Sequence, residues 1–209
     1  MNYNINCNST NTEKNDGKWS TGSFQESLLK WFDQNARILP WRDCPTPYRV
    51  WISEVMLQQT RVEAVKPYFE RFVAEIPSIG ALAEISDERL MKLWEGLGYY
   101  SRAVNLKKAA CIIKEKYQGE LPADRNELLA LPGIGPYTSG AIASIAFDQR
   151  TPAVDGNVLR VLARIVGQFG DIRSNSVKKE LENLADQLLP PTRPGDFNQA
   201  FMELGAMIC

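Results

Sequence analysis

The feature that most restricts the fold of this chain is the lack of any stretch in which apolar and polar residues alternate over five or more positions. Such alternation is typical of a strand with one buried face. The nearest candidate, residues 151–154, contains Pro152, which cannot donate a hydrogen bond within a sheet. Apolar residues instead recur at helical spacing, as at Leu28, Leu29 and Phe32. We therefore predict an all-α fold with helices at about 48–60, 62–74, 78–84, 86–95 and 101–117.

The absence of histidine from all 209 residues restricts the chemistry. Serine–histidine–aspartate sites, cysteine–histidine sites, histidine–zinc hydrolases and zinc deaminases all need histidine, so these classes are excluded. Acid–base chemistry must therefore use carboxylates, Lys, Tyr or Cys. The 24 Lys and Arg residues nearly balance the 25 Asp and Glu residues, for a net charge of −1. DNA binding would then depend on an uneven distribution of charge.

The four cysteines, Cys7, Cys44, Cys111 and Cys209, are scattered and include no C-x-x-C pair. Without a secretory signal, this spacing indicates thiols in a reducing compartment. No apolar run approaches the roughly 18 residues of a membrane span, so we expect a cytoplasmic protein without a membrane partner. Residues 1–22 are rich in Asn, Ser, Thr, Lys and Gly, and we predict that they form a disordered tail.

A glycine-rich turn stands between two helical patterns at residues 131–140. Gly133 and Gly135 allow a tight turn whose N–H groups point the same way, and Pro136 suits the first position of the next helix. An isolated pair of this kind is more often an ordinary helix–helix turn. Here the whole segment matches the helix-hairpin-helix signature, which binds the DNA backbone without reading sequence. Residues 89–116 carry a local charge of +5, which either forms a solvated helix face or faces phosphates.

Two carboxylates stand out, although each has an ordinary explanation. Glu54 falls on a polar face with Gln58 and Arg61, at spacings of four and seven residues, where a lone glutamate is usually just solvated. Asp155 precedes a helical pattern and could be only its N-cap. The local pattern alone does not distinguish these readings from catalytic roles.

Five segments in fixed order give a more specific signal. Together they resemble the MutY-type adenine DNA glycosylases of the helix-hairpin-helix superfamily, over about residues 24–209. The segments are 54–60, 93–100, 131–137, 154–158 and 197–209. The resemblance implies two helical lobes flanking a cleft for DNA and the extruded base. One lobe is a six-helix barrel at 41–149 with the helix-hairpin-helix at 128–147, and the other combines 23–40 and 150–209.

The resemblance also implies roles for individual residues. Glu54 matches the general acid, Asp155 the carboxylate that stabilises the sugar cation, and Tyr137 a tyrosine beside this pair. Cleaving an N-glycosidic bond needs an acid for the leaving base and an anion near C1′, so the pair is chemically sensible. For Glu54 to be protonated near neutral pH, burial would have to raise its pKa, while polar surroundings would keep Asp155 charged. Expected contacts to the adenine or the DNA are Arg37, Leu39, Trp41, Gln58, Gln59, Thr60, Tyr99, Gly133, Gly135 and Asn157.

Tyr137 also separates two activities within the superfamily. Members of the endonuclease III type carry a lysine at this place, two residues after the second glycine of the hairpin. Without that amine no Schiff base can form to drive strand cleavage. We therefore predict a monofunctional glycosylase that hydrolyses adenine from duplex DNA containing A:8-oxoguanine or A:G mispairs, acting as a monomer and associated with the nucleoid in a bacterium.

The cysteines depart from the family pattern. Relatives hold a [4Fe–4S] cluster on four cysteines with about six, two and five residues between successive ligands. Cys209 matches the first ligand, and the other three cysteines do not fit the spacing, so we expect that this chain cannot hold the cluster by itself. The family's C-terminal domain for 8-oxoguanine is also missing, so the chain is either truncated or a degenerate member of the family. The alternative function is a non-catalytic DNA-binding module with the same helix-hairpin-helix.

Overall fold

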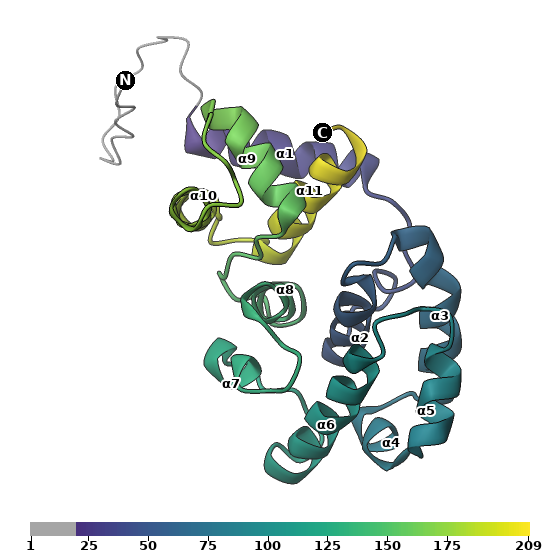
Figure 1. Ribbon diagram of the computed structural model, residues 1–209. Helices are drawn as coiled ribbons and strands as arrows, with labels where there is room; N and C mark the ends of the chain where they lie inside the picture. Colours follow the sequence, from purple (N-terminus) through teal and green to yellow (C-terminus); the bar gives the residue numbers. More distant parts are fainter. Residues whose placement is uncertain (1–19) are drawn as a thin grey trace.

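The computed structural model describes residues 20–209 as an all-helical chain, which confirms the predicted fold class (Figure 1). Over these residues there are eleven helices and no strand. No helix within this range is both long and apolar enough to cross a membrane. The helices are α1 (Thr21–Asn35), α2 (Pro47–Leu57), α3 (Val62–Glu75), α4 (Ile79–Glu84), α5 (Asp87–Trp94), α6 (Ser101–Lys116), α7 (Arg125–Leu129), α8 (Pro136–Phe147), α9 (Gly156–Val166), α10 (Asn175–Leu188) and α11 (Pro194–Met207).

Short polar side chains fix the starts of most helices. The Ser86 hydroxyl accepts a hydrogen bond from the Arg89 N–H and so caps α5. Ser20 caps α1 in the same way, so the tail predicted for 1–22 cannot extend to residue 22. Residues 1–19 of that tail lie outside the described residues. The same kind of bond begins the helices after Thr46, Ser78, Asp124, Asp155 and Ser174.

The buried apolar residues form two separate cores. The first joins α2–α8 and contains Trp51 and Trp94, both fully buried. The second joins α1, α9, α10 and α11 around Phe197. Figure 1 shows the two groups of helices next to each other. The loops between α1 and α2 and between α8 and α9 link them. Each core gives one lobe.

The first lobe differs from the expected six-helix barrel in two details. It contains seven helices, because residues 125–129 form a short helix, α7, ahead of the glycine-rich turn. Leu39, assigned by sequence to the other lobe, is 2% exposed and belongs to the first core. The chain therefore enters the first lobe before residue 41.

Helix α8 connects the two lobes through close backbone packing. An added Cβ at Gly140 would lie 2.3 Å from the Pro152 carbonyl oxygen, so only glycine fits there. Asn198 of α11 reaches the same place: its Nδ2 donates to Ser144 Oγ at 2.8 Å and to the Thr151 carbonyl at 2.9 Å. Its Oδ1 accepts from the Ala153 N–H at 3.2 Å. These contacts fix the path of the chain into Asp155.

Candidate active site

A cleft of about 1030 Å³ lies between the lobes and is lined by both. Most of the residues singled out from sequence line this one cleft. They are Arg37, Leu39, Trp41, Glu54, Gln58, Gln59, Thr60, Tyr99, Tyr137, Asp155 and Asn157. Gly133, Gly135 and Cys209 are not among the residues that line it.

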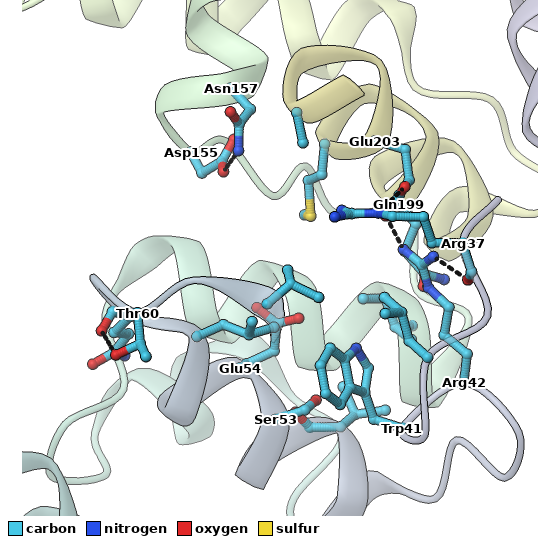
Figure 2. Close-up of a pocket in the computed structure, with 18 of the residues that line it drawn as sticks. Arg37, Trp41, Arg42, Ser53, Glu54, Thr60, Asp155, Asn157, Gln199 and Glu203 are labelled. Atoms are coloured by element: carbon cyan, nitrogen blue, oxygen red, sulfur yellow. Dashed lines mark hydrogen bonds and ion pairs between the residues drawn. The ribbon is translucent and has the colours of Figure 1, made fainter. Parts of the chain in front are cut away.

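Glu54 lies on α2 with its side chain directed into the cleft (Figure 2). The residue is 7% exposed, and its Oε2 atom has no hydrogen-bond partner among the described residues. Burial raises the pKa of Glu54 from its ordinary value of 4.5 to about 7. The nearby Tyr137 hydroxyl and Arg42 guanidinium act in the opposite direction, whereas the Asp155 charge adds to the rise. Burial therefore shifts the pKa of Glu54 in the direction that a general acid near neutral pH requires.

Tyr137 stands close to Glu54 because it is the second residue of α8, directly after the glycine-rich turn. Its hydroxyl donates to the Met202 Sδ atom of α11 at 3.4 Å. Burial raises the pKa of Tyr137 well above its ordinary value, and the charges of Glu54 and Asp155 raise it further. The phenol therefore stays protonated and available as a donor across the neutral range.

Asp155 is the N-cap of α9, and it also forms part of the wall of the cleft. One carboxylate oxygen accepts from the Val158 N–H at 2.9 Å, and the other accepts from Asn157 Nδ2 at 2.8 Å. Figure 2 shows Asp155 and Asn157 on one side of the cleft and Glu54 on the opposite side. Arg160 Nη2 in turn donates to Asn157 Oδ1 at 2.7 Å. The two carboxyl groups thus come from different lobes. Burial favours the neutral form of Glu54, and two hydrogen-bond donors hold Asp155 in place.

A second cluster of charges at the cleft was not predicted from sequence. Glu203 of α11 is buried and accepts hydrogen bonds from Arg37 at 2.7 and 2.9 Å and from Arg42 at 2.9 Å. Burial alone would raise the pKa of Glu203, but the two guanidinium groups lower it below its ordinary value. Arg42 also donates to Gln199 Oε1 at 2.8 Å (Figure 2). These partners lie up to 166 residues apart, so no local pattern could reveal them.

Two apolar residues expected in the base pocket are mostly covered by protein. Trp41 is 6% exposed, and its ring packs edge-on against Phe69 with the centroids 5.4 Å apart. Leu39 is also buried in the first core. Each therefore presents little of its surface to the cleft.

The residues expected at the DNA surface include two with unusual backbones. Gln59 and Tyr99 have φ angles of 58° and 47°, which non-glycine residues rarely adopt, and both side chains are exposed. Gln58 instead points inward, donating to Thr138 Oγ1 at 3.2 Å. Thr60 also lines the cleft. Gly133, with φ 79°, packs against Asn105 in the hairpin turn.

The basic stretch at 89–116 does not form a continuous cationic face. Arg102 is 7% exposed, and four other cations pair with carboxylates of the same lobe. Those pairs are Arg89 with Glu75, Lys92 with Glu95, Lys107 with Asp87 and Lys114 with Glu84. Three of these pairs join different helices, and the Lys92–Glu95 pair lies at the end of α5. That the remaining face of the stretch contacts phosphates stays a prediction.

Comparison with known families fits this geometry. Residues 52–190 match the family model described as the HhH-GPD superfamily base excision DNA repair protein. The chain belongs to this superfamily. The match spans both carboxylates and the helix-hairpin-helix, and it runs from α2 through α10.

Curated HhH-GPD relatives include adenine DNA glycosylases. The chain is 50% identical over 196 residues to the Mus musculus adenine DNA glycosylase, covering 90% of this chain and 38% of the relative. It is 43% identical over 187 residues to the enzyme of Buchnera aphidicola subsp. Acyrthosiphon pisum, covering 89% of this chain and 53% of the relative. The chain thus spans about two fifths to half of the length of these relatives.

Solved structures show the same HhH-GPD fold. A thermostable thymine-DNA glycosylase matches with a TM-score of 0.81 and 30% identity, covering 90% of this chain and 87% of that one. A non-covalent endonuclease III–DNA complex matches with a TM-score of 0.75 and 24% identity, covering 92% and 88% of the two chains. The two-lobed architecture is therefore the one shared by this superfamily.

The described cysteines do not fit a [4Fe–4S] cluster. Cys209 is exposed beyond the end of α11, while Cys44 and Cys111 lie on other parts of the fold. Between residues 20 and 209, no group of three or more Cys, His, Asp or Glu side chains is placed to hold a metal ion. Cys7 lies outside the described residues. A cluster held by four thiolates needs more than the three cysteines present among residues 20–209.

Proposed function

We propose that this chain hydrolyses the N-glycosidic bond of adenine mispaired with 8-oxoguanine or guanine in duplex DNA. The observation that carries the proposal is the pairing of a buried Glu54, whose pKa is raised to about 7, with Asp155 across one cleft. A binding module needs neither a protonated buried acid nor an opposed carboxylate. The similarity to curated adenine DNA glycosylases supports adenine as the base.

In the proposed reaction, Glu54 is the general acid. Its proton passes to the adenine as the C1′–N bond breaks, and the bonding electron pair leaves with the base. The sugar is left as an oxocarbenium ion, which the Asp155 carboxylate stabilises from the other side of the cleft. Water then adds to C1′ and returns a proton to the Glu54 carboxylate, so the enzyme is restored and an abasic site remains.

The rest of the cleft is proposed to hold the extruded base. Flipping the adenine out of the stack needs a rigid pocket and donors or acceptors for its edges. Trp41 and Leu39 supply apolar edges that are already packed, and the Arg37–Glu203–Arg42 network supplies polar groups in a fixed arrangement. We propose that Gln59 and Tyr99, at the exposed rim, enter the duplex beside the vacated position.

Strand cleavage is not part of the proposed activity. The residue two positions after Gly135 is Tyr137, and no lysine lines the cleft within the described residues. A Schiff base therefore has no amine near C1′. The product should be an intact abasic strand that breaks only after alkali treatment, and borohydride should trap little covalent adduct.

The deciding experiment is a single-turnover assay on an A:8-oxoguanine duplex, with alkali treatment, comparing the parent chain with Glu54→Gln. The parent should release adenine at a rate that falls as the pH rises through about 7, because only protonated Glu54 is an acid. Glu54→Gln should release none and still bind the duplex. Duplex binding by a parent that never releases adenine would favour the non-catalytic module instead.

Two further properties complete the proposal. We propose that the protein acts as a monomer in the compartment that holds DNA, and that Cys209 is a single ligand to a [4Fe–4S] cluster whose other thiolates are not among residues 20–209. Iron content and visible absorption of the purified 209-residue chain test the second statement, with a colourless protein as the expected result.

A further inference from the structure

Arg102 has the densest set of hydrogen bonds among the described cations. It is the second residue of α6 and is 7% exposed. It forms no ion pair among residues 20–209, and instead its guanidinium is surrounded by backbone oxygens. Nη1 donates to the carbonyls of Val55, Met56 and Gln58 at 3.0, 2.7 and 2.6 Å, and Nη2 donates to those of Leu97 and Gly98 and to Thr60 Oγ1, each at 3.2 Å.

These bonds join two loops that are about 40 residues apart in sequence, as the partners Gln58 and Gly98 show. The first loop ends α2 and carries Gln59, and the second loop precedes α6 and carries Tyr99. Both residues have positive φ angles, 58° and 47°. Two of the carbonyls that Arg102 binds, those of Gln58 and Gly98, belong to the peptides immediately before Gln59 and Tyr99.

A positive φ at a non-glycine residue persists only where the surroundings fix the neighbouring peptides. Arg102 is placed to do this for both loops with one rigid, planar group. Its guanidinium also lies 5.4 Å from the centroid of the Tyr99 ring and 5.4 Å from that of Trp94. The guanidinium therefore contacts the backbone of one rim loop and both the backbone and the side chain of the other.

We propose that Arg102 is a positioning residue that sets Gln59 and Tyr99 together at the rim of the cleft, so that both side chains enter the duplex in one arrangement. This inference rests on the proposed function. Arg102 itself touches no reacting atom in this scheme. It acts through the two loops, and its loss should affect duplex engagement before it affects the chemistry at Glu54.

The test compares Arg102→Lys with the parent by duplex affinity and by single-turnover adenine release. Lysine keeps the positive charge, but its single ammonium cannot bind both loops. Affinity should fall about tenfold or more, the scale expected for lost hydrogen bonds to a charged group. The pH midpoint of base release should stay at the parent value, because Glu54 keeps its surroundings.

The matched control is Ile113→Val, a fully buried residue of the same helix that does not line the cleft. It should lower the melting temperature and leave affinity within about twofold of the parent, as expected for a small core change away from the site. A double variant, Arg102→Lys with Tyr99→Ala, separates positioning from general destabilisation. If Arg102 acts through Tyr99, the double variant should be scarcely weaker than the weaker single variant.

Three results would overturn the inference: parent affinity in Arg102→Lys, losses that multiply in the double variant, or a shifted pH midpoint. If Arg102→Lys does not fold, Gly98→Ala replaces it in the test. An added Cβ at Gly98 meets no atom within 4 Å, so the substitution strains only the backbone, whose φ angle there is 74°. Full affinity in Gly98→Ala would then contradict the role of this loop. A parent that binds DNA without releasing adenine contradicts the proposed function alone, because the affinities still test Arg102.

Discussion

Four carboxylates line the cleft, and three of them have clearly different surroundings. Glu54 has a buried oxygen with no partner among residues 20–209, Asp155 accepts from two donors, and Glu203 is held by two guanidinium groups. Glu54 is placed to carry a proton near neutral pH. Separate environments of this kind are how one site obtains both an acid and an anion from the same functional group.

The raised pKa of Glu54 should make folding stability depend on pH. The pKa of Glu54 in the folded protein, about 7, lies above the ordinary value of 4.5. The contribution of this carboxyl group to folding stability is therefore complete below about pH 4.5 and is lost as the pH rises through 7. Glu54→Gln cannot ionise and should escape this loss. Relative to the variant, the parent should lose about 3 kcal/mol of unfolding free energy between pH 4.5 and 8, at roughly 1.4 kcal/mol per pKa unit.

Urea unfolding of both proteins at pH 5 and pH 8 measures this difference. If the two free energies change in parallel with pH, the Glu54 carboxyl titrates normally, and the proposed acid would be ionised in the working enzyme. The sign matters, because a gain of parent stability at high pH would mean that a cation stabilises the ionised form.

Asp155→Asn separates the two roles of that residue. Asparagine can still accept from the Val158 N–H and cap α9, so the melting temperature should change little. The charge that would stabilise the sugar cation is lost, so adenine release should slow by about two or more orders of magnitude. Thermal unfolding and single-turnover rates measured on the same preparation distinguish the roles. Unchanged release would leave Asp155 as a helix cap only.

At the residue scale, the sequence could identify these carboxylates only through their family resemblance. Local pattern left Glu54 as a solvated residue and Asp155 as a cap, because neither burial nor the opposite wall can be inferred from neighbours in the chain. Arg102 was counted as a surface cation, and Glu203 was not singled out at all. Their hydrogen-bond partners lie 44 and 166 residues away in the sequence, and patterns of local residue spacing cannot predict contacts over such separations.

At the scale of elements, the helices themselves were predictable and their ends were less so. Periodic apolar residues placed α3 to α6 within a residue or two of the observed limits. The helix expected at 48–60 ends instead at Leu57, because Gln59 turns to positive φ and Arg102 takes the last carbonyls. A side chain from a distant helix therefore decided where this one stops.

The contact between α8 and the segment before Asp155 gives a prediction at this scale. Gly140→Ala places a Cβ 2.3 Å from the Pro152 carbonyl, so backbone must move. We expect a loss of about 1–3 kcal/mol in unfolding free energy, as for other overpacked sites. Adenine release should also slow, because Asp155 follows three residues after Pro152.

Gly80→Ala is the matched control for that substitution. Gly80 also lies in a helix, α4, but the nearest atom to an added Cβ is Ser78 Oγ at 3.8 Å. Alanine there should stabilise the protein by about 0.5–1 kcal/mol, the usual helix preference over glycine. Denaturant unfolding measures the change in unfolding free energy of both variants. Equal changes at the two sites would mean that α8 does not pack as described.

At the scale of the whole molecule, the two cores differ in how completely they cover their helices. Helix α2 buries eight of its eleven residues, whereas α10 buries three of fourteen. Local opening costs least where few apolar groups are covered. Hydrogen exchange followed by mass spectrometry should therefore show faster amide exchange in α10 than in α2. Equal protection of the two helices would show that the lobes open as one unit.

The pairing of the first described helix with the last has a consequence for synthesis on the ribosome. The second core combines Leu28 and Phe32 of α1 with Phe197 and Phe201 of α11, so it cannot close until residue 201 has been made. The first core, by contrast, is complete in sequence by residue 143. Glu54 is thus in place before Asp155 has its final support. Until residue 201 has been made, a nascent chain would carry the proposed acid without a supported anion, and we expect no base release from it.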